Sequence, residues 1–171
     1  MRKFTFAFLA VTTLLIAAVA DAGGPQFRAR LSGDQEVPPT SVDARGQFSI
    51  HFDKALTKAE FTLTVRDLEG VFRAHLHCNA TGVNGPIFIH LMGDLPVATG
   101  SGAQSRQNID GKWLSNATLT DQGFSNTTTP CGDTLAEVVA AANAGNVYVN
   151  VHTVDFPGGA IRGQLVPSDH H

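Results

Sequence analysis

The sequence predicts an all-β fold, a sandwich or a barrel, with one short helix. Short apolar runs alternate with polar residues along most of the chain, and this period of two is typical of strands that bury one face. Glycine and proline separate the runs and mark turns. Only residues 135–142 have the composition of a helix. Because we find no internal repeat and no shift in composition, a single domain is expected.

Eight segments are predicted to be strands. In the second of them, Phe48, Ile50 and Phe52 face one way, and the polar residues between them face the other. The pattern is weakest in the sixth segment. In chain order the predicted strands are 27–31, 46–52, 56–65, 72–78, 87–92, 112–119, 147–153 and 160–166.

The connections between these strands are rich in turn-forming residues. Residues 32–43 contain two consecutive prolines, and residues 99–107 are small and polar, as in a surface loop. Residues 108–111 end in Asp-Gly and are predicted to form a turn. For the helix at 135–142, we expect Asp133 to cap the first turn.

The N-terminus has the organisation of an export signal. Two basic residues precede an apolar run over 4–19, and Ala20 and Ala22 follow as the small residues of a cleavage site. The alternative is an uncleaved membrane anchor, for which this run is short, because a span needs about 20 residues. We therefore predict a signal peptide over 1–22, a mature domain over 23–171, and a secreted or periplasmic location.

The sequence argues against nucleic acid as a partner and against a membrane span in the mature chain. The chain has 12 Lys and Arg against 15 Asp and Glu, and the sequence shows no basic stripe or cluster, so nucleic acid is not expected to bind. Beyond the first 22 residues no stretch approaches the length of a membrane span. We therefore expect no membrane span after signal cleavage.

Both cysteines, Cys78 and Cys131, lie in the mature part. In an oxidising compartment such a pair is most simply a disulfide, which would close a loop of about fifty residues and stabilise the fold by roughly 3–4 kcal/mol. The alternative is a thiolate metal ligand. A copper site of that kind needs a histidine and a methionine shortly after the cysteine, and neither cysteine is followed by them.

Four histidines lie within predicted strands. His75 and His77 are one residue apart, so both project from the same face of their strand. His152 shares a face with Asn150, and aliphatic residues occupy the opposite face of that strand. His90 lies on the strand 87–92 in the same manner. If these strands are neighbours, the imidazoles converge.

Convergent imidazoles predict a metal site. Neutral imidazole is the commonest protein ligand for zinc and copper, and a His-x-His strand fixes two ligands at once. We therefore propose His75, His77 and His152 as ligands, with His90 as a fourth candidate and copper favoured over zinc. In the alternative interpretation the histidines are structural and hydrogen-bond within a polar layer. The remaining histidines, including His51, are interpreted as solvent-exposed.

No other motif indicates a chemical activity. The sequence contains no nucleophile elbow, no phosphate-binding loop, no zinc-protease motif and no calcium-binding loop. No pair of carboxylates stands out either. The histidine set is therefore the principal functional feature of the sequence.

Five motifs, taken in order, resemble the CHRD domain, a module named from chordin and also found in many bacterial exported proteins. The resemblance covers residues 27–166. One departure is Ala160, where the family usually has an acidic residue. The motifs are ARLSG (29–33) with EVPP (36–39), AHLH (74–77), GVNGPI (82–87), YVNVHT (148–153) and PGGAIRGQL (157–165).

This resemblance implies a Greek-key β-sandwich of immunoglobulin-like or superoxide-dismutase-like appearance. Chordin is an extracellular antagonist of signalling proteins, so the family also implies a possible protein partner. A non-catalytic interaction or envelope module is then one alternative function. In such a module the histidines would share a polar core layer with Asn150 and Arg162.

A weaker likeness to copper/zinc superoxide dismutases implies a second alternative, a copper-only redox enzyme. Those enzymes also combine a His-x-His strand, a later histidine, a disulfide and a late arginine. In this chain the analogous residues would be the three histidines above, the pair Cys78 and Cys131, and Arg162. By that likeness Arg162 would steer an anionic substrate towards the metal.

Overall fold

The computed structural model describes residues 23–92, 107–121, 124 and 129–168. The predicted signal peptide, most of the loop at 99–107, and the last two histidines lie outside these residues. The described chain folds into antiparallel strands with one α-helix, so the prediction of an all-β fold with one short helix is confirmed. None of its helices is long and apolar enough to cross a membrane.

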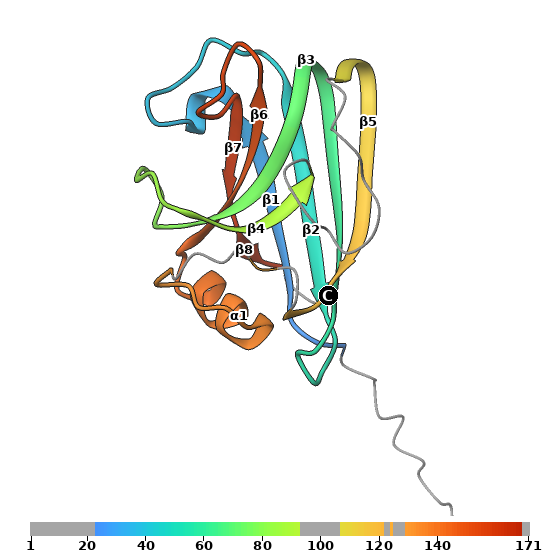
Figure 1. The fold of residues 1–171 in the computed structure, drawn as a ribbon, viewed down its shortest axis with the longest axis vertical. Helices are drawn as coiled ribbons and strands as arrows, with labels where there is room; N and C mark the ends of the chain where they lie inside the picture. Colours follow the sequence, from blue (N-terminus) through green and yellow to red (C-terminus); the bar gives the residue numbers. More distant parts are fainter. Residues whose placement is uncertain (1–22, 93–106, 122–123, 125–128, 169–171) are drawn as a thin grey trace, which may run out of the picture.

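Figure 1 shows the helix at one end of the sheet, near the last strand. In chain order the elements are β1 (Gln26–Ser32), a 3₁₀ turn η1 (Gly33–Gln35), β2 (Arg45–Phe52), β3 (Ala59–Cys78), β4 (Ile87–Met92), β5 (Gln107–Leu119), α1 (Leu135–Asn143), β6 (Val147–Thr153), β7 (Ile161–Gln164) and β8 (Val166–Pro167).

β3 is the longest strand and takes part in two sets of pairings. Its first half, 59–66, pairs with β2 and β5, whereas its second half pairs with β4 and β6. The sequence predicted two separate strands here, and that prediction was wrong. Between the halves, Asp67 and Gly70 have positive φ and the register shifts, so the strand bends without losing its partner β5.

The predicted turn at 108–111 was also wrong, because these residues belong to β5. Ile109 pairs with Leu68, and Gln107 pairs with Val71, across the irregular part of β3. Between the pairs Arg66–Lys112 and Leu68–Ile109, β5 has one residue more than β3, so the Asp-Gly pair forms a bulge within the strand instead of a turn. The predicted last strand, 160–166, is divided into β7 and β8.

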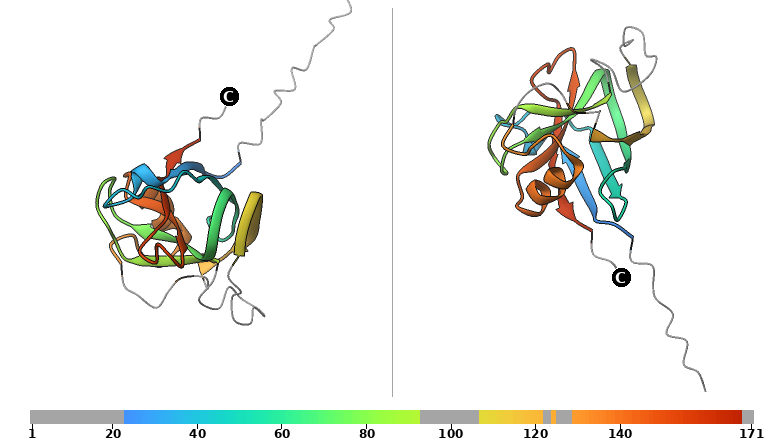
Figure 2. Two further views of the ribbon diagram at one scale, coloured as in Figure 1. Left: turned by 90° about the horizontal axis from the view of Figure 1, so that it is seen from above. Right: turned by 60° about the horizontal axis from the view of Figure 1, so that its bottom comes forward.

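Strand pairing closes into a ring. β2 pairs with β1 on one side and with β3 on the other, and the ring continues through β6 and β7 back to β1. The last link consists of a single pair, Ser32 with Arg162. Figure 2 shows the strands curving around a common interior. Apolar side chains of β1, β2, β3, β4, β6 and β7 form the core. Aromatic pairs such as Phe27 with Phe52, whose rings meet edge to face, pack there.

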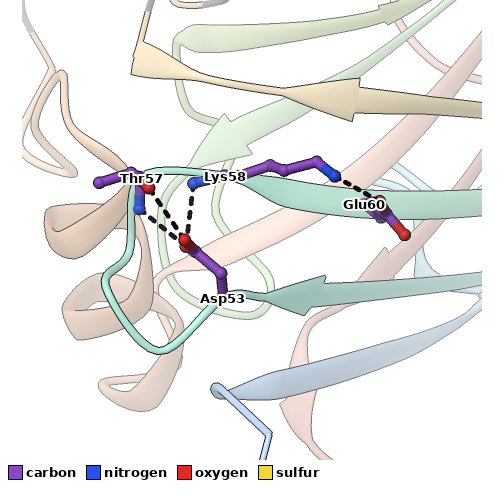
Figure 3. A network of polar contacts seen from close by, with 4 residues as sticks. All are labelled: Asp53, Thr57, Lys58 and Glu60. Carbon is purple, nitrogen blue, oxygen red and sulfur yellow. Dashed lines mark hydrogen bonds and ion pairs between the residues drawn. The ribbon is translucent and has the colours of Figure 1, made fainter.

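The β2–β3 hairpin is fixed by one carboxylate. Asp53 accepts hydrogen bonds from the backbone N–H and the hydroxyl of Thr57 and from the backbone N–H of Lys58 (Figure 3). These bonds lower the pKa of Asp53, because they favour its ionised form. The Lys58 ammonium then donates to Glu60 at the start of β3, at 2.8 Å. The hairpin therefore sets the register of β2 against β3.

α1 begins one residue later than its predicted cap implied. Thr134, not Asp133, is the N-cap, and it forms a reciprocal capping box with Glu137. The helix buries four apolar residues against the end of the sheet. Just before the helix, Cys131 forms the predicted disulfide with Cys78 at the end of β3, and their Cα atoms are 5.7 Å apart.

Removing the disulfide tests its contribution to folding. Because the bond closes a loop of 53 residues, the double variant Cys78→Ala/Cys131→Ala is expected to lose about 4 kcal/mol of unfolding free energy, on the chain-entropy relation. Urea denaturation of the variant and the oxidised protein measures this loss. A reductant should weaken the parent protein by a similar amount and leave the variant unchanged; equal stability of the two proteins would contradict the assignment.

Candidate metal centre

Three histidines from two neighbouring strands converge. His75 and His77 lie on the second half of β3, and His152 lies on β6, which pairs with it. One ring nitrogen of each histidine lies within 4.8 Å of those of the other two. The convergence that the strand pattern predicted is therefore present in the structure.

The strand register explains why the polar side chains share one face. Asn150 on β6 lies opposite His75, and Arg162 on β7 lies opposite Asn150. The same row continues to His90 on β4 and to Ser32 on β1. Directly opposed residues of an antiparallel pair project to the same side of the sheet. This row places Asn150 and Arg162 next to the histidines, as the resemblance implied.

The polar face of β6 is as well buried as its aliphatic face. His75 is 0% exposed, His77 is 7% exposed, and His152 is 4% exposed. The sequence did not predict this burial, because alternation alone indicates only that two faces differ. The segments that cover the face are the β3–β4 connection, the residues around Glu36, and the β6–β7 connection. The site is therefore shielded from solvent.

Backbone carbonyls set the tautomers of two histidines. Nδ1 of His77 donates to the carbonyl of Gly85 at 2.9 Å, and Nδ1 of His152 donates to the carbonyl of Pro157 at 3.1 Å. A carbonyl only accepts, so Nδ1 carries the proton and the lone pair of a neutral ring is on Nε2. This is the arrangement by which proteins orient histidine ligands.

His75 is bonded to another histidine of the group. Its Nδ1 lies 3.0 Å from Nε2 of His152. The Nε2 atoms of His75 and His77 are buried and have no hydrogen-bond partner among the described residues. A buried polar atom without a partner is costly. These two atoms therefore mark the place where a ligand would add an interaction that the protein itself does not make.

Burial keeps the imidazoles neutral. Loss of solvation, together with the neighbouring His152 and other cations, lowers the pKa of His75 from its ordinary 6.5 to about 2. Burial also lowers the pKa of His77, although the hydrogen bond to Gly85 acts in the opposite direction. Neutral rings keep the lone pair that a metal ion requires.

The spacing of the three nitrogens is close to that around one ion. Bonds from copper or zinc to imidazole nitrogen are about 2 Å, so two ligands on one ion lie at most ~4 Å apart. The three ring nitrogens lie up to 4.8 Å apart. A small rotation of the rings would bring them within the ~4 Å limit. Separations above about 8 Å would have excluded a common ion.

The fourth candidate, His90, lies beside the group and outside it. Its ring meets the ring of His75 edge to face, with centroids 4.9 Å apart. Among the described residues, the potential ligand set contains only the other three histidines. Met92, on the same strand, is buried in the apolar core.

Arg162 attaches the β3–β4 connection to the sheet. Its guanidinium donates to the carbonyls of Ala80 and Val83 and to the side-chain oxygen of Asn84. It also lies over the ring of Tyr148, 3.4 Å from the centroid, and that ring stacks on His77. Arg162 is 2% exposed, and its hydrogen bonds hold the β3–β4 connection against the sheet.

Glu36 is part of the buried layer, although sequence analysis treated it only as one residue of a motif. One of its carboxylate oxygens accepts from the amide of Asn150 at 3.4 Å. Burial raises the pKa of Glu36 to about 7, and Arg162 opposes this rise. The α-carbon of Gly159 (φ +138°) approaches both side chains so closely that a Cβ would lie 2.5 Å from the Asn150 amide nitrogen. In the sequence, the Gly-Gly pair of the last motif is the signal that could have indicated this close approach.

Comparison with known protein families agrees with the resemblance of the motifs. The family model described as the CHRD domain matches residues 27–165. Among the curated proteins, none matches the chain. The matched region contains all of the histidines discussed above.

Acid should destabilise the metal-free protein. His75 and His77 are neutral in the fold and take up protons on unfolding below pH 6.5, so stability falls as pH falls. Glu36 acts in the opposite direction, since its raised pKa makes it lose a proton on unfolding between pH 4.5 and about 7. Two histidines outweigh one carboxyl, so unfolding takes up protons on balance and the unfolding free energy should fall as the pH falls from 6.5 towards 4.5.

Replacing Glu36 separates these contributions. In Glu36→Gln the opposing carboxyl is gone, so the slope of the unfolding free energy against pH should become steeper. Urea unfolding across this pH range, in the presence of a chelator, measures it. The exposed Glu69→Gln is the matched control. An unchanged slope in Glu36→Gln would show that Glu36 is ionised in the fold.

Arg162→Lys tests the role of the guanidinium. Lysine keeps the charge but loses the planar group that stacks on Tyr148 and bonds several oxygens at once. We expect a loss of about 2–3 kcal/mol in unfolding free energy, since buried acceptors lose their donors. Faster hydrogen exchange at the amides of 80–85 should accompany this loss. Wild-type stability in this variant would show that Arg162 does not hold the segment.

Proposed function

The chain belongs to the CHRD domain family, and we propose that it binds a metal ion through His75, His77 and His152, with copper favoured over zinc. One observation carries the proposal: three buried imidazoles from adjacent strands present nitrogens within 4.8 Å of one another. A buried face of a sheet is an unusual place for three polar rings unless they have a common partner.

The donor set favours copper. All three ligands would be imidazole nitrogens, which suit copper and zinc, and the group contains no carboxylate or thiolate. At a given nitrogen site copper binds more tightly than zinc. An ion bound to three protein ligands would retain an open coordination position, which in other proteins accommodates water or substrate.

The remaining residues of the site would orient the ligands and exclude water. The carbonyls of Gly85 and Pro157 hold two rings in the tautomer that leaves Nε2 available. Tyr148 stacks on His77 with an interplanar angle of 14° and limits its rotation. A metal held by Nε2 of His152 would take the lone pair that now accepts the hydrogen bond from Nδ1 of His75, so that hydrogen bond would be lost.

We also propose that the protein is exported after cleavage of residues 1–22 and works as a single domain over 23–171. A disulfide between Cys78 and Cys131 is consistent with an oxidising compartment, whether secreted or periplasmic. The export signal itself is supported by the sequence pattern alone.

A non-catalytic interaction module with structural histidines is the second candidate. Each of the three imidazoles forms a hydrogen bond within the protein, and this observation favours it. A dismutase-type copper enzyme has less support, because Arg162, the residue expected to steer substrate, is buried and donates to the covering segment. Its enzyme activity stays a prediction from the likeness alone.

Titration calorimetry with Cu(II) and Zn(II) tests the metal site. We expect the purified protein to bind one equivalent, copper more tightly, and to gain about 2.7 kcal/mol of stability at a hundred-fold excess over Kd. The triple variant His75→Ala/His77→Ala/His152→Ala should lose this binding. His51→Ala, which removes an exposed imidazole, is the control.

Two further measurements cover the case of a misfolded variant. Circular dichroism reports whether the triple variant retains its sheet, and the thermal shift of the parent protein with each metal does not depend on any variant. No metal-dependent shift, or equal binding by parent and triple variant, would refute the site. Superoxide consumption by the copper-loaded protein above that of free copper would support the enzyme instead of a simple binding role.

A further inference from the structure

A row of adjoining hollows, here called the groove, lies along β2 on the side of the sheet that faces away from the core. Four hollows of about 600, 320, 450 and 400 Å³ follow one another along the strand. Neighbouring hollows share lining residues. Gln47 and Thr64 line both the first and the second hollow, Ser49 and Thr62 line both the second and the third, and His51 lines both the third and the fourth. The groove therefore extends over the whole length of β2, which lies between β1 and β3 in Figure 1.

Three arginines from three adjacent strands line one end of this groove. Arg30 lies on β1, Arg45 on β2 and Arg66 on β3, and all are exposed. Arg45 lies directly opposite Arg66, and the register continues from Arg66 to Lys112 on β5. The linear sequence shows no basic cluster, because these arginines are far apart in the chain. Strand pairing brings together residues far apart in the chain.

The arrangement is unfavourable unless an anion is present. Like charges directly opposite in a sheet repel each other. Among the described side chains, Asp34 is the one acidic group that lines this end, and its pKa is lowered first by a hydrogen bond from Ser32 and then by Arg45. Guanidinium groups bind carboxylate and sulfate through two parallel hydrogen bonds, so an oxyanion would bind well here.

The rest of the groove favours a linear polar polymer. Gln47 and Ser49 are exposed along its middle, flanked by Thr62 and Thr64, and these side chains offer hydroxyl and amide groups. A protein partner would need an apolar centre, which these lining side chains do not provide. A peptide cannot add as a strand, because β2 is already paired on both sides.

We propose that this groove binds a linear acidic polysaccharide, one that bears carboxylate or sulfate groups. Its anionic groups would lie at Arg30, Arg45 and Arg66, and its hydroxyls would bond to the side chains along β2. This proposal does not depend on the histidine site, which lies on other strand pairings and a different face.

Affinity electrophoresis of the purified protein in gels that contain polygalacturonate, dextran sulfate or neutral dextran tests it. We expect retardation by at least one acidic polymer, none by dextran, and weaker retardation at higher salt. Arg30→Gln/Arg66→Gln should raise the dissociation constant about tenfold or more. Its melting temperature should not fall, because the change relieves repulsion between like charges.

Lys54→Gln is the matched control, since it removes one positive charge from the β2–β3 turn at the far end. The single variant Arg66→Gln should bind the acidic polymer more weakly than the parent protein does. Lys54→Gln should bind it with nearly the affinity of the parent protein. Equal losses in these two variants, binding of neutral dextran, or no binding of either acidic polymer would overturn the proposal. Inorganic sulfate that competes at the same molar concentration as polymer sulfate would also overturn it, because the site would then recognise only a single anion.

Discussion

The histidine site depends on the burial of a polar face. β6 is covered on both sides, so the polar groups on the face of Tyr148, Asn150 and His152 depend on partners within the protein. The partners come from outside the sheet: the carbonyls of Gly85 and Pro157 and the buried carboxyl of Glu36 are the principal ones. The covering segments are consequently as important for the site as the strands that bear the histidines.

β3 connects the two functional surfaces of the molecule. Its second half bears His75 and His77 towards a dry, covered layer, and its first half contributes Arg66 to a wet and open groove. The bend near Gly70 lets one strand serve both sets of pairings. A single strand thus places a buried neutral cluster and an exposed cationic cluster in one domain without mutual repulsion, because water screens the second.

Much of the fold was predictable because period-two alternation is a local property. The strands around Phe48 and His75 and the helix all have signals within a few residues, and the disulfide joins the two cysteines that the chain has. The errors arose where pairing overrode local signals. Residues 108–111 contain a turn dipeptide but extend as a strand against β3, and the glycine near the middle of β3 bends the strand without ending it. Pairing with β5 supplies the hydrogen bonds that make both outcomes favourable.

By itself, the sequence determined which residues share a face: His75 with His77, and Asn150 with His152. Only the tertiary structure decided that these faces meet, that they are buried, that Glu36 and Arg162 join them, and that the arginines of β1, β2 and β3 form a cluster. The physical reason is range. A side chain's direction follows from the backbone of its own strand, whereas its neighbours and its exposure follow from pairings and covering segments that are distant in the chain.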